Sequence, residues 1–463
     1  MMLPLARDPA AEARVVRSRV GSHLFVVDGS RLYDVEPHVA DRVAAALAAK
    51  GAVPAPEERG LLATLGLFSG PAQARFIDGQ PLDPPPLYSL SLNVAQACNM
   101  VCGYCYADEG RFGGRPRLMG LDVARASVDR LIAESSPGAD LVLGFMGGEP
   151  LVHRAVVHET TRYAARAARA AGRRIRFAMT TNATLIQPAD AELFAELPFA
   201  LAVSIDGKRE QHDVSRPMKD GSSGYDRLLA GLAVLERHGR PRHLSARVTV
   251  TPLTGDLLPI LDHVLGLGFD EVGFAAVLVS VDPSLAFGPA QFPRFLERMI
   301  ACGEKALGEI AAGRAYPFGN FETALQQIHR GTHRPYPCGA GAAYLSANAE
   351  GRLFACHRLI DDPAYAMGTV HGGTDLAARR EHLARSHVDL MEPCRGCWAR
   401  YLCGGGCYHE VSRRGRVGCD YIQGWLEFCL RAYAELSTTR PEYFTMPAKY
   451  FAESVSSPTT LAQ

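Results

Sequence analysis

Short apolar runs alternate with amphipathic stretches through the middle of the chain, from Leu87 to about Arg330. Repeated strand–helix units of this kind predict an α/β fold whose parallel sheet curls into a partial (β/α)6 barrel, with its chemistry at the carboxyl ends of the strands. The expected strands are Tyr88–Val94, Asp140–Phe145, Arg174–Met179, Phe199–Ser204, Ser245–Thr251 and Glu271–Val277. The expected helices are Leu121–Glu134, Ala155–Ala171, Tyr225–Arg237 and Leu257–Leu267.

Different patterns flank this core on both sides. His23 to Asp34 predicts a hairpin that turns at Asp28-Gly29, a helix is expected from Pro37 to Ala49, and Pro81 to Pro86 predicts a linker. After Pro335 glycine and cysteine become dense and the regular alternation stops, which predicts a loop-rich domain stapled by metal. The expected domains are a small α+β unit over 1–82, the core over 83–330, the cysteine-rich domain over 331–453 and a flexible tail over 454–463.

Composition narrows the function classes. The 463 residues carry 49 basic and 49 acidic side chains, so no basic footprint for nucleic acid is expected. The apolar run Leu141 to Met146 is strand-sized and too short for a bilayer, and Met1 to Val16 lacks a secretory apolar region. We therefore expect a cytoplasmic protein without a membrane partner. Twelve cysteines in a reducing compartment indicate metal rather than disulfides.

Three cysteines follow the first expected strand, in the order Cys98-Asn-Met-Val-Cys102-Gly-Tyr104-Cys105. Three thiolates on one loop can hold three irons of a [4Fe-4S] cluster and leave the fourth iron open to a ligand. An incomplete zinc site or cysteines packed in a core are the alternatives. The strand-to-loop context favours the cluster.

The motif resembles that of the radical S-adenosylmethionine (SAM) superfamily. The resemblance implies that Cys98, Cys102 and Cys105 bind the cluster and that SAM occupies its fourth iron, so that one electron cleaves SAM to a 5′-deoxyadenosyl radical. It also implies a SAM pocket. A plain strand-ending turn is the alternative for Gly147 to Pro150, and a solvated or peptide-binding role is the alternative for Arg216. The implied pocket residues are Tyr104, Gly147, Gly148, Glu149, Pro150, Thr181, Asn182, Ser204, Asp206 and Arg216.

Seven further cysteines follow, in the order Cys338-x12-Gly351-x4-Cys356, Cys394-x2-Cys397-x5-Cys403-x3-Cys407 and Cys419. This order resembles the SPASM extension of radical SAM peptide maturases. A zinc ribbon could use four of the cysteines but would leave three idle. The resemblance implies two auxiliary [4Fe-4S] clusters, and therefore three in all. One would be held by Cys394, Cys397, Cys403 and Cys419, and the other by Cys338, Cys356 and Cys407.

The three-cysteine set has no obvious fourth ligand, so an upstream residue completes it or one iron is open to a substrate thiolate. Cys302 and Cys429 lie in expected helices and are interpreted as core residues. The catalytic residues stay unassigned. The loop from Tyr106 to Gly114 is similar to that of thioether-forming maturases, namely the maturation proteins of quinohemoprotein amine dehydrogenase and the SCIFF peptide maturases.

The resemblance implies an enzyme that joins a substrate cysteine to an Asp or Glu carbon of a peptide or small protein, with a flavodoxin or ferredoxin as electron donor. The hairpin unit is expected either to hold the substrate by strand addition or to cap the barrel. Three alternatives stay open. They are a formylglycine-forming sulfatase maturase, which needs a dedicated aspartate base, a carbon–carbon cyclophane former, and a non-enzymatic cluster-bearing electron carrier.

Overall fold

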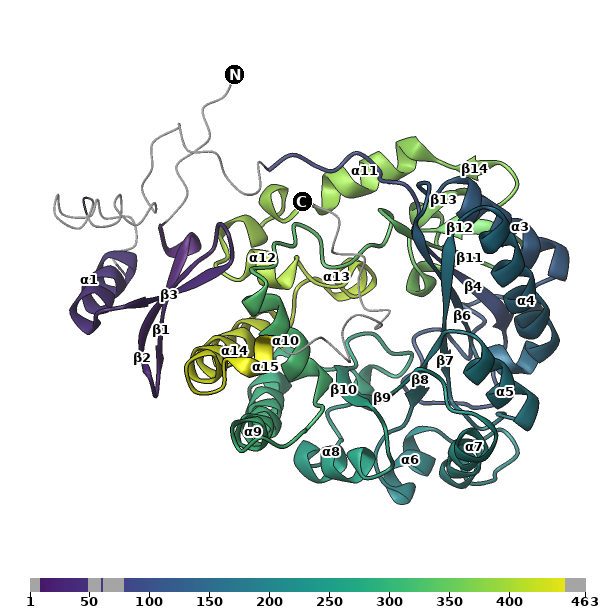
Figure 1. Ribbon diagram of the computed structural model, residues 1–463, viewed down its shortest axis with the longest axis horizontal. Helices are drawn as coiled ribbons and strands as arrows, with labels where there is room; N and C mark the ends of the chain where they lie inside the picture. Colours follow the sequence, from purple (N-terminus) through teal and green to yellow (C-terminus); the bar gives the residue numbers. More distant parts are fainter. Residues whose placement is uncertain (1–8, 49–59, 61–78, 446–463) are drawn as a thin grey trace.

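One large sheet organises the structure, a computed structural model that describes residues 9–48, 60 and 79–445 (Figure 1). Its central strands run parallel in the order β10-β9-β8-β7-β6-β4. All six expected strands are present and the predicted fold class is confirmed. Their bounds are β4 Ser89–Gln96, β6 Asp140–Gly147, β7 Arg174–Thr181, β8 Phe199–Ser204, β9 His243–Val250 and β10 Glu271–Ala276.

Helices cover the outer face of this sheet (Figure 1). In α4 the buried positions Val156, Thr160 and Ala164 recur at helical spacing, so one stripe faces the strands and the charged residues face solvent. The four expected helices are present as α3, α4, α7 and α8, and α5 and α6 were not anticipated. The bounds are α3 Leu121–Ala133, α4 Arg154–Ala170, α5 Pro188–Glu196, α6 Arg209–Ser215, α7 Gly224–His238, α8 Leu257–Leu265, α9 Phe292–Ala311 and α10 Gly319–His329.

The sheet stays open and continues into the cysteine-rich segment. Strand β11 pairs with β4 in parallel, and β12, β13 and β14 follow it antiparallel, while the short β5 pairs with the far end of β4. The order of hydrogen-bonded strands therefore runs from β10 to β14 without closing on itself, and the sheet forms a partial barrel. Their bounds are β5 Arg117–Leu118, β11 Tyr344–Ala347, β12 Arg352–Phe354, β13 Ala366–Thr369 and β14 Gly373–Thr374.

The remaining C-terminal segment is more helical than its glycine content indicated. Helix α14 packs against α9 and α10, so it joins the cysteine-rich segment to the barrel. Cys302 in α9 and Cys429 in α14 are fully buried, which confirms that they are core residues. No helix of the described residues is long and apolar enough to cross a membrane. The bounds are α11 Leu376–Ser386, α12 Arg400–Cys403, α13 Tyr408–Arg414, α14 Cys419–Thr439 and α15 Glu442–Thr445.

The described residues of the N-terminal unit form a separate three-stranded antiparallel sheet beside helix α1 (Figure 1). The expected hairpin is confirmed, because Val26 of β2 pairs with Arg31 of β3. Strand β1 was not anticipated, since Arg14 and Arg17 interrupt its apolar pattern. The bounds are β1 Ala13–Ser18, β2 Gly21–Val26, β3 Arg31–Val35 and α1 Pro37–Ala48. Parts of the expected unit 1–82 and the expected tail 454–463 lie outside the described residues.

A buried arginine ties this unit to the C-terminal segment. Arg400 of α12 donates to the Ala11 carbonyl and forms an ion pair with Glu12 at 2.8 Å. Arg14 reaches Glu427 of α14 at 2.7 Å. In the described residues the unit therefore rests on α12 and α14 of the cysteine-rich segment.

Candidate active site

A cavity opens where the six parallel strands end, as the fold class predicts. Each of these strands contributes to its wall through its last residues or the loop that follows. Of the implied pocket residues, seven line this cavity: Tyr104, Gly147, Gly148, Thr181, Asn182, Ser204 and Arg216. The thiols of the first cysteine motif line it as well: Cys98, Cys102 and Cys105.

The first cysteine loop is closely packed against the loop that follows β6. A side chain at Gly148 would place its Cβ 2.3 Å from the Ala97 carbonyl oxygen, and one at Gly110 would lie 2.5 Å from the Gly148 Cα. Only glycine allows backbones to approach so closely. Burial raises the pKa of the Cys98 thiol to about 12, so binding of iron by this residue would release a proton.

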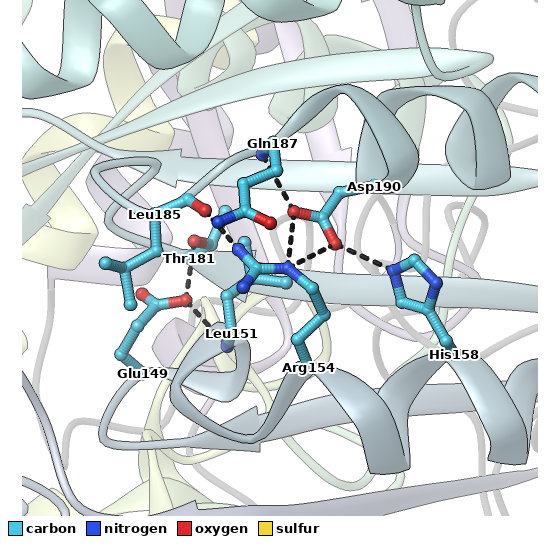
Figure 2. Close-up of polar contacts among 8 residues, drawn as sticks. All are labelled: Glu149, Leu151, Arg154, His158, Thr181, Leu185, Gln187 and Asp190. Atoms are coloured by element: carbon cyan, nitrogen blue, oxygen red, sulfur yellow. Dashed lines mark hydrogen bonds and ion pairs between the residues drawn. The ribbon is translucent and has the colours of Figure 1, made fainter.

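Glu149 lies behind the cavity wall and is fully buried. Its carboxylate accepts hydrogen bonds from the Thr181 hydroxyl at 2.8 Å and from the Leu151 amide at 3.1 Å (Figure 2). It also accepts from the Asn182 amide at 2.7 Å. Burial raises the pKa of Glu149, and these three hydrogen bonds oppose that shift. The carboxylate thus joins the ends of β6 and β7. Its predicted contact with the SAM ammonium stays a prediction, as does the contribution of Pro150, which is also buried.

A second buried carboxylate holds the loop that follows β7 (Figure 2). The carboxylate of Asp190 accepts hydrogen bonds from Arg154 Nε, which lies 2.9 Å from both of its oxygens. It is also hydrogen-bonded to His158 at 2.7 Å and to the backbone amide of Gln187 at 2.8 Å. Arg154 also donates to the Leu185 carbonyl. The loop carries Asn182, so this network positions a residue of the cavity wall.

One residue of this loop, Ala183, adopts the left-handed conformation with φ 62°. Its carbonyl oxygen would lie 2.1 Å from a Cβ at position 231, which explains why glycine occurs there. On the same loop, the Asn182 side chain donates to Asn99 at 2.8 Å. The end of β7 is therefore attached directly to the cysteine loop.

Tyr104, Asp206 and Arg216 form a buried triad on the wall. Arg216 Nη1 donates to the Tyr104 hydroxyl at 2.6 Å, and that hydroxyl donates to Asp206, which also accepts from the Thr249 amide at 3.0 Å. Arg216 is 7% exposed, so it is not a solvated loop charge. Its Nε is buried without a hydrogen-bond partner among the described residues, and an anionic ligand such as the SAM carboxylate fits that donor. Asp206 is buried behind the lining, so its predicted contact with SAM stays a prediction.

The other seven cysteines fall into two groups by mutual electrostatic interaction. Burial, together with the nearby thiol of Cys407, raises the pKa of Cys356 to about 12 and that of Cys338 to about 11. In the second group, burial and the nearby thiol of Cys394 both raise the pKa of three cysteines: Cys397, Cys403 and Cys419. The groups coincide with the two sets that the SPASM resemblance implies.

Buried thiols gathered in this way suit iron–sulfur clusters, because iron supplies the positive charge that stabilises clustered thiolates. In the described residues, no three His, Cys, Asp or Glu side chains converge closely enough to chelate a single metal ion. The fit to clusters therefore rests on the grouping of the thiols.

Several residues of the site have no signal in the sequence. Arg154, His158 and Asp190 resemble ordinary charges on amphipathic helices, and only the fold brings them to the loop after β7. Arg358 also lines the cavity, although it belongs to the cysteine-rich segment. Its place two residues after Cys356 was the one available hint.

This fold and this site together define a radical SAM enzyme. The sequence profile of the radical SAM superfamily matches residues 92–259, the part of the chain that carries the first cysteine loop and the ends of β4 to β9. A serine-type anaerobic sulfatase-maturating enzyme from Bacteroides thetaiotaomicron is 30% identical over 385 residues, which cover 74% of this chain and 88% of the relative. The chain therefore belongs to the radical SAM superfamily, in the family of these maturases.

Two solved structures share the fold. One is described as native anSMEcpe with bound AdoMet, with a TM-score of 0.63, 19% identity and coverage of 77% of this chain and 99% of that chain. The other is Streptococcus suis SuiB bound to its precursor peptide SuiA, with a TM-score of 0.51, 13% identity and coverage of 88% and 97%. Both likenesses cover more of the chain than the barrel alone.

Proposed function

We propose that the protein is a radical SAM maturase that forms a thioether cross-link within a peptide or small protein substrate. The observation that carries the proposal is the division of the twelve cysteines. Three line the SAM cavity, four form one auxiliary group, three form another, and the last two are buried in α9 and α14. The names of the B. thetaiotaomicron relative and of the SuiB complex support a peptide or protein substrate.

The three groups would each hold a [4Fe-4S] cluster, the first of them with SAM. When bound, the clusters and SAM supply the 5′-deoxyadenosyl radical and an acceptor for the electron that the substrate releases. The surrounding residues hold SAM, with Arg216 Nε donating to its carboxylate and Ser204 and Asn182 offering polar contacts on the wall. Gly147 and Gly148, whose close packing keeps the loop after β6 against the cysteine loop, would present their backbone to its methionine end.

The three-cysteine group supports a thiol-containing substrate. Cys302 and Cys429 lie in the helical core, so no other cysteine of the chain is left to complete the group. A substrate thiolate is a soft ligand that fits such a position. In the reaction the acceptor carbon loses a hydrogen atom, the substrate thiol loses a proton, and one electron leaves as the carbon–sulfur bond forms. The acceptor carbon is that of an Asp or Glu residue.

Formylglycine formation is the second candidate, because the relative is a sulfatase-maturating enzyme. That chemistry needs a carboxylate base close to the reacting residue. Among the described residues that line the cavity, Glu109 is the single Asp or Glu, and it forms ion pairs with Lys219 at 2.5 Å and Arg111 at 3.3 Å. The two cations engage different oxygens of this carboxylate, so a substrate proton would have to compete with both ion pairs. The described lining therefore offers no carboxylate that is free of an ion pair to serve as the base, which favours the thioether.

The N-terminal unit has a place in this proposal. In the described residues β3 is hydrogen-bonded on one side only, by β2, and Tyr33 on it is 54% exposed. An open strand edge can add a substrate strand. We therefore assign recruitment to residues 1–82, catalysis to 83–330 and the auxiliary clusters to 331–453, in a cytoplasmic enzyme reduced by a flavodoxin or ferredoxin.

Two synthetic peptides separate the candidates when incubated anaerobically with the reconstituted enzyme, SAM and a reductant. One contains a cysteine together with an aspartate and a glutamate, and the other contains a cysteine in a sulfatase-type sequence. A thioether removes two hydrogens and leaves no thiol to alkylate, whereas formylglycine reacts with a hydrazide. If the peptides gain an aldehyde but no cross-link, and Glu109→Gln no longer forms the aldehyde, the protein forms formylglycine rather than a thioether.

A further inference from the structure

Arg358 lies where three cysteine-bearing loops meet. Its guanidinium carbon is 4.6 Å from the ring centre of Tyr106, which directly follows Cys105. Its Nη1 donates to Glu410 at 2.6 Å and to the Cys407 sulfur at 3.6 Å. One side chain thus contacts the first cysteine loop and the three-cysteine group together.

Part of this guanidinium remains available to a ligand. Arg358 lines the SAM cavity and its side chain is 29% exposed. Both of its hydrogen bonds of ordinary geometry use Nη1, and the Tyr106 hydroxyl interacts with the same guanidinium. A guanidinium has five N–H donors in a planar fork, so two bonds from Nη1 and one contact with the Tyr106 hydroxyl leave further N–H donors for a ligand in the cavity. A guanidinium with two such donors can bind a carboxylate through two parallel hydrogen bonds.

The charges on the wall point to an anionic partner. Within the described residues, two guanidinium groups line the cavity, those of Arg216 and Arg358, against the single carboxylate of Glu109. Glu109 is already paired with Lys219 and Arg111. SAM brings one carboxylate, for which the buried Nε of Arg216 is available. The guanidinium of Arg358, beside the auxiliary cysteine loops, is then available to the peptide substrate.

We propose that Arg358 binds a carboxylate of the substrate, an Asp or Glu side chain, and so selects the residue whose carbon–hydrogen bond is broken. The inference rests on the proposed function, because it assigns the acceptor residue of that same reaction. Glu410 neutralises part of the guanidinium charge and thereby limits the affinity for the substrate carboxylate. Arg358 holds the acceptor between the SAM cavity and the three-cysteine group, where the new bond forms.

The test uses two small probes, N-acetylaspartate amide and N-acetylasparagine amide, titrated calorimetrically into reconstituted enzyme with SAM. Wild-type enzyme should prefer the aspartate probe by about tenfold or more, as expected for charge-assisted hydrogen bonds. Arg358→Gln should abolish the preference. Arg358→Lys should retain only part of it, because the fork is lost. Glu410→Gln should increase it, since the competing carboxylate is gone.

Arg413→Gln is the matched control. Arg413 lies on the same helix as Glu410 but pairs with Asp362 at 3.0 Å on the surface, so the preference should not change. A wild-type enzyme without preference, or a preference that survives in Arg358→Gln or is unmoved in Glu410→Gln, overturns the proposal. Iron content and 5′-deoxyadenosine formation are measured on the same samples. Absence of 5′-deoxyadenosine from the wild type would instead refute the proposed function, whatever the probes show.

Discussion

The buried carboxylate of Glu149 offers a sharp test of how the cavity is held together. In Glu149→Gln the side chain keeps its shape, but one oxygen becomes an N–H donor. Whichever way the amide turns, that donor faces the backbone N–H of either Asn182 or Leu151, each of which donates to a carboxylate oxygen in the wild type. The substitution therefore removes one charge-assisted hydrogen bond and leaves one buried amide without an acceptor.

A hydrogen bond to a charged group contributes about 1.5–3 kcal/mol, and an unsatisfied buried donor costs about 1–3 kcal/mol. Because these terms overlap, we expect the free energy of unfolding to fall by about 2–4 kcal/mol. Glu149 is 0% exposed, so solvent does not screen the effect. For a domain of about 250 residues, 1 kcal/mol shifts the melting temperature by about 2 °C, so the melting temperature should fall by roughly 4–8 °C.

The assay is thermal unfolding together with equilibrium dialysis of SAM, both under anaerobic conditions. Affinity for SAM should also fall, because Asn182 lines the cavity and loses its anchor. Glu159→Gln is the control, since Glu159 is exposed on α4 and its change should stay within about 0.5 kcal/mol. If Glu149→Gln unfolds and binds SAM like this control, Glu149 does not organise the wall as described.

Three further substitutions test other parts of the structure. Arg400→Leu should cost about 3–5 kcal/mol and loosen the N-terminal unit, because it removes the buried guanidinium that pairs with Glu12 and donates to the Ala11 carbonyl. The loosening would be seen as faster hydrogen exchange of β1, and unchanged exchange would contradict this anchor. Gly231→Ala should cost about 1–3 kcal/mol and weaken SAM binding in dialysis, because its Cβ would meet the Ala183 oxygen. Burial raises the pKa of Glu322 to about 7, so between pH 4.5 and 7 the folded state keeps a proton that the unfolded state has released. The free energy of unfolding should therefore fall as the pH rises from about 4.5 to about 7. In Glu322→Gln the melting temperature should no longer show this dependence on pH.

The sequence predicted the barrel well because its information is local. Each buried strand is an apolar run that ends in the loop carrying chemistry, as at Phe199–Ser204, where the expected and observed bounds agree. The order of the cysteines also led to the expected division into two auxiliary sets, which stays a prediction as a ligand assignment. Periodicity and spacing are sufficient for such features.

Features that depend on distant pairing were missed. Strand β11 has only four residues, and its place beside β4 brings together Ser91 and Ser346, which lie 255 residues apart in the chain. The Arg154–Asp190 pair and the position of Arg358 arise in the same way, because ordinary polar residues acquire their roles from neighbours that are remote in sequence. The hydrogen bonds by which Glu149 and Asp206 join neighbouring strand ends were likewise not visible in the sequence, while their expected contacts with SAM stay predictions.

SAM cleavage in the absence of substrate tests the central claim most directly. Reconstituted wild-type protein, given SAM and a chemical reductant, should release 5′-deoxyadenosine and contain about twelve irons per chain, as three [4Fe-4S] clusters require. Replacement of Cys98, Cys102 and Cys105 by alanine should remove about four irons and all 5′-deoxyadenosine, while the auxiliary groups keep theirs. Continued release of 5′-deoxyadenosine by the triple variant, or bound zinc in place of iron in the wild type, would contradict the account.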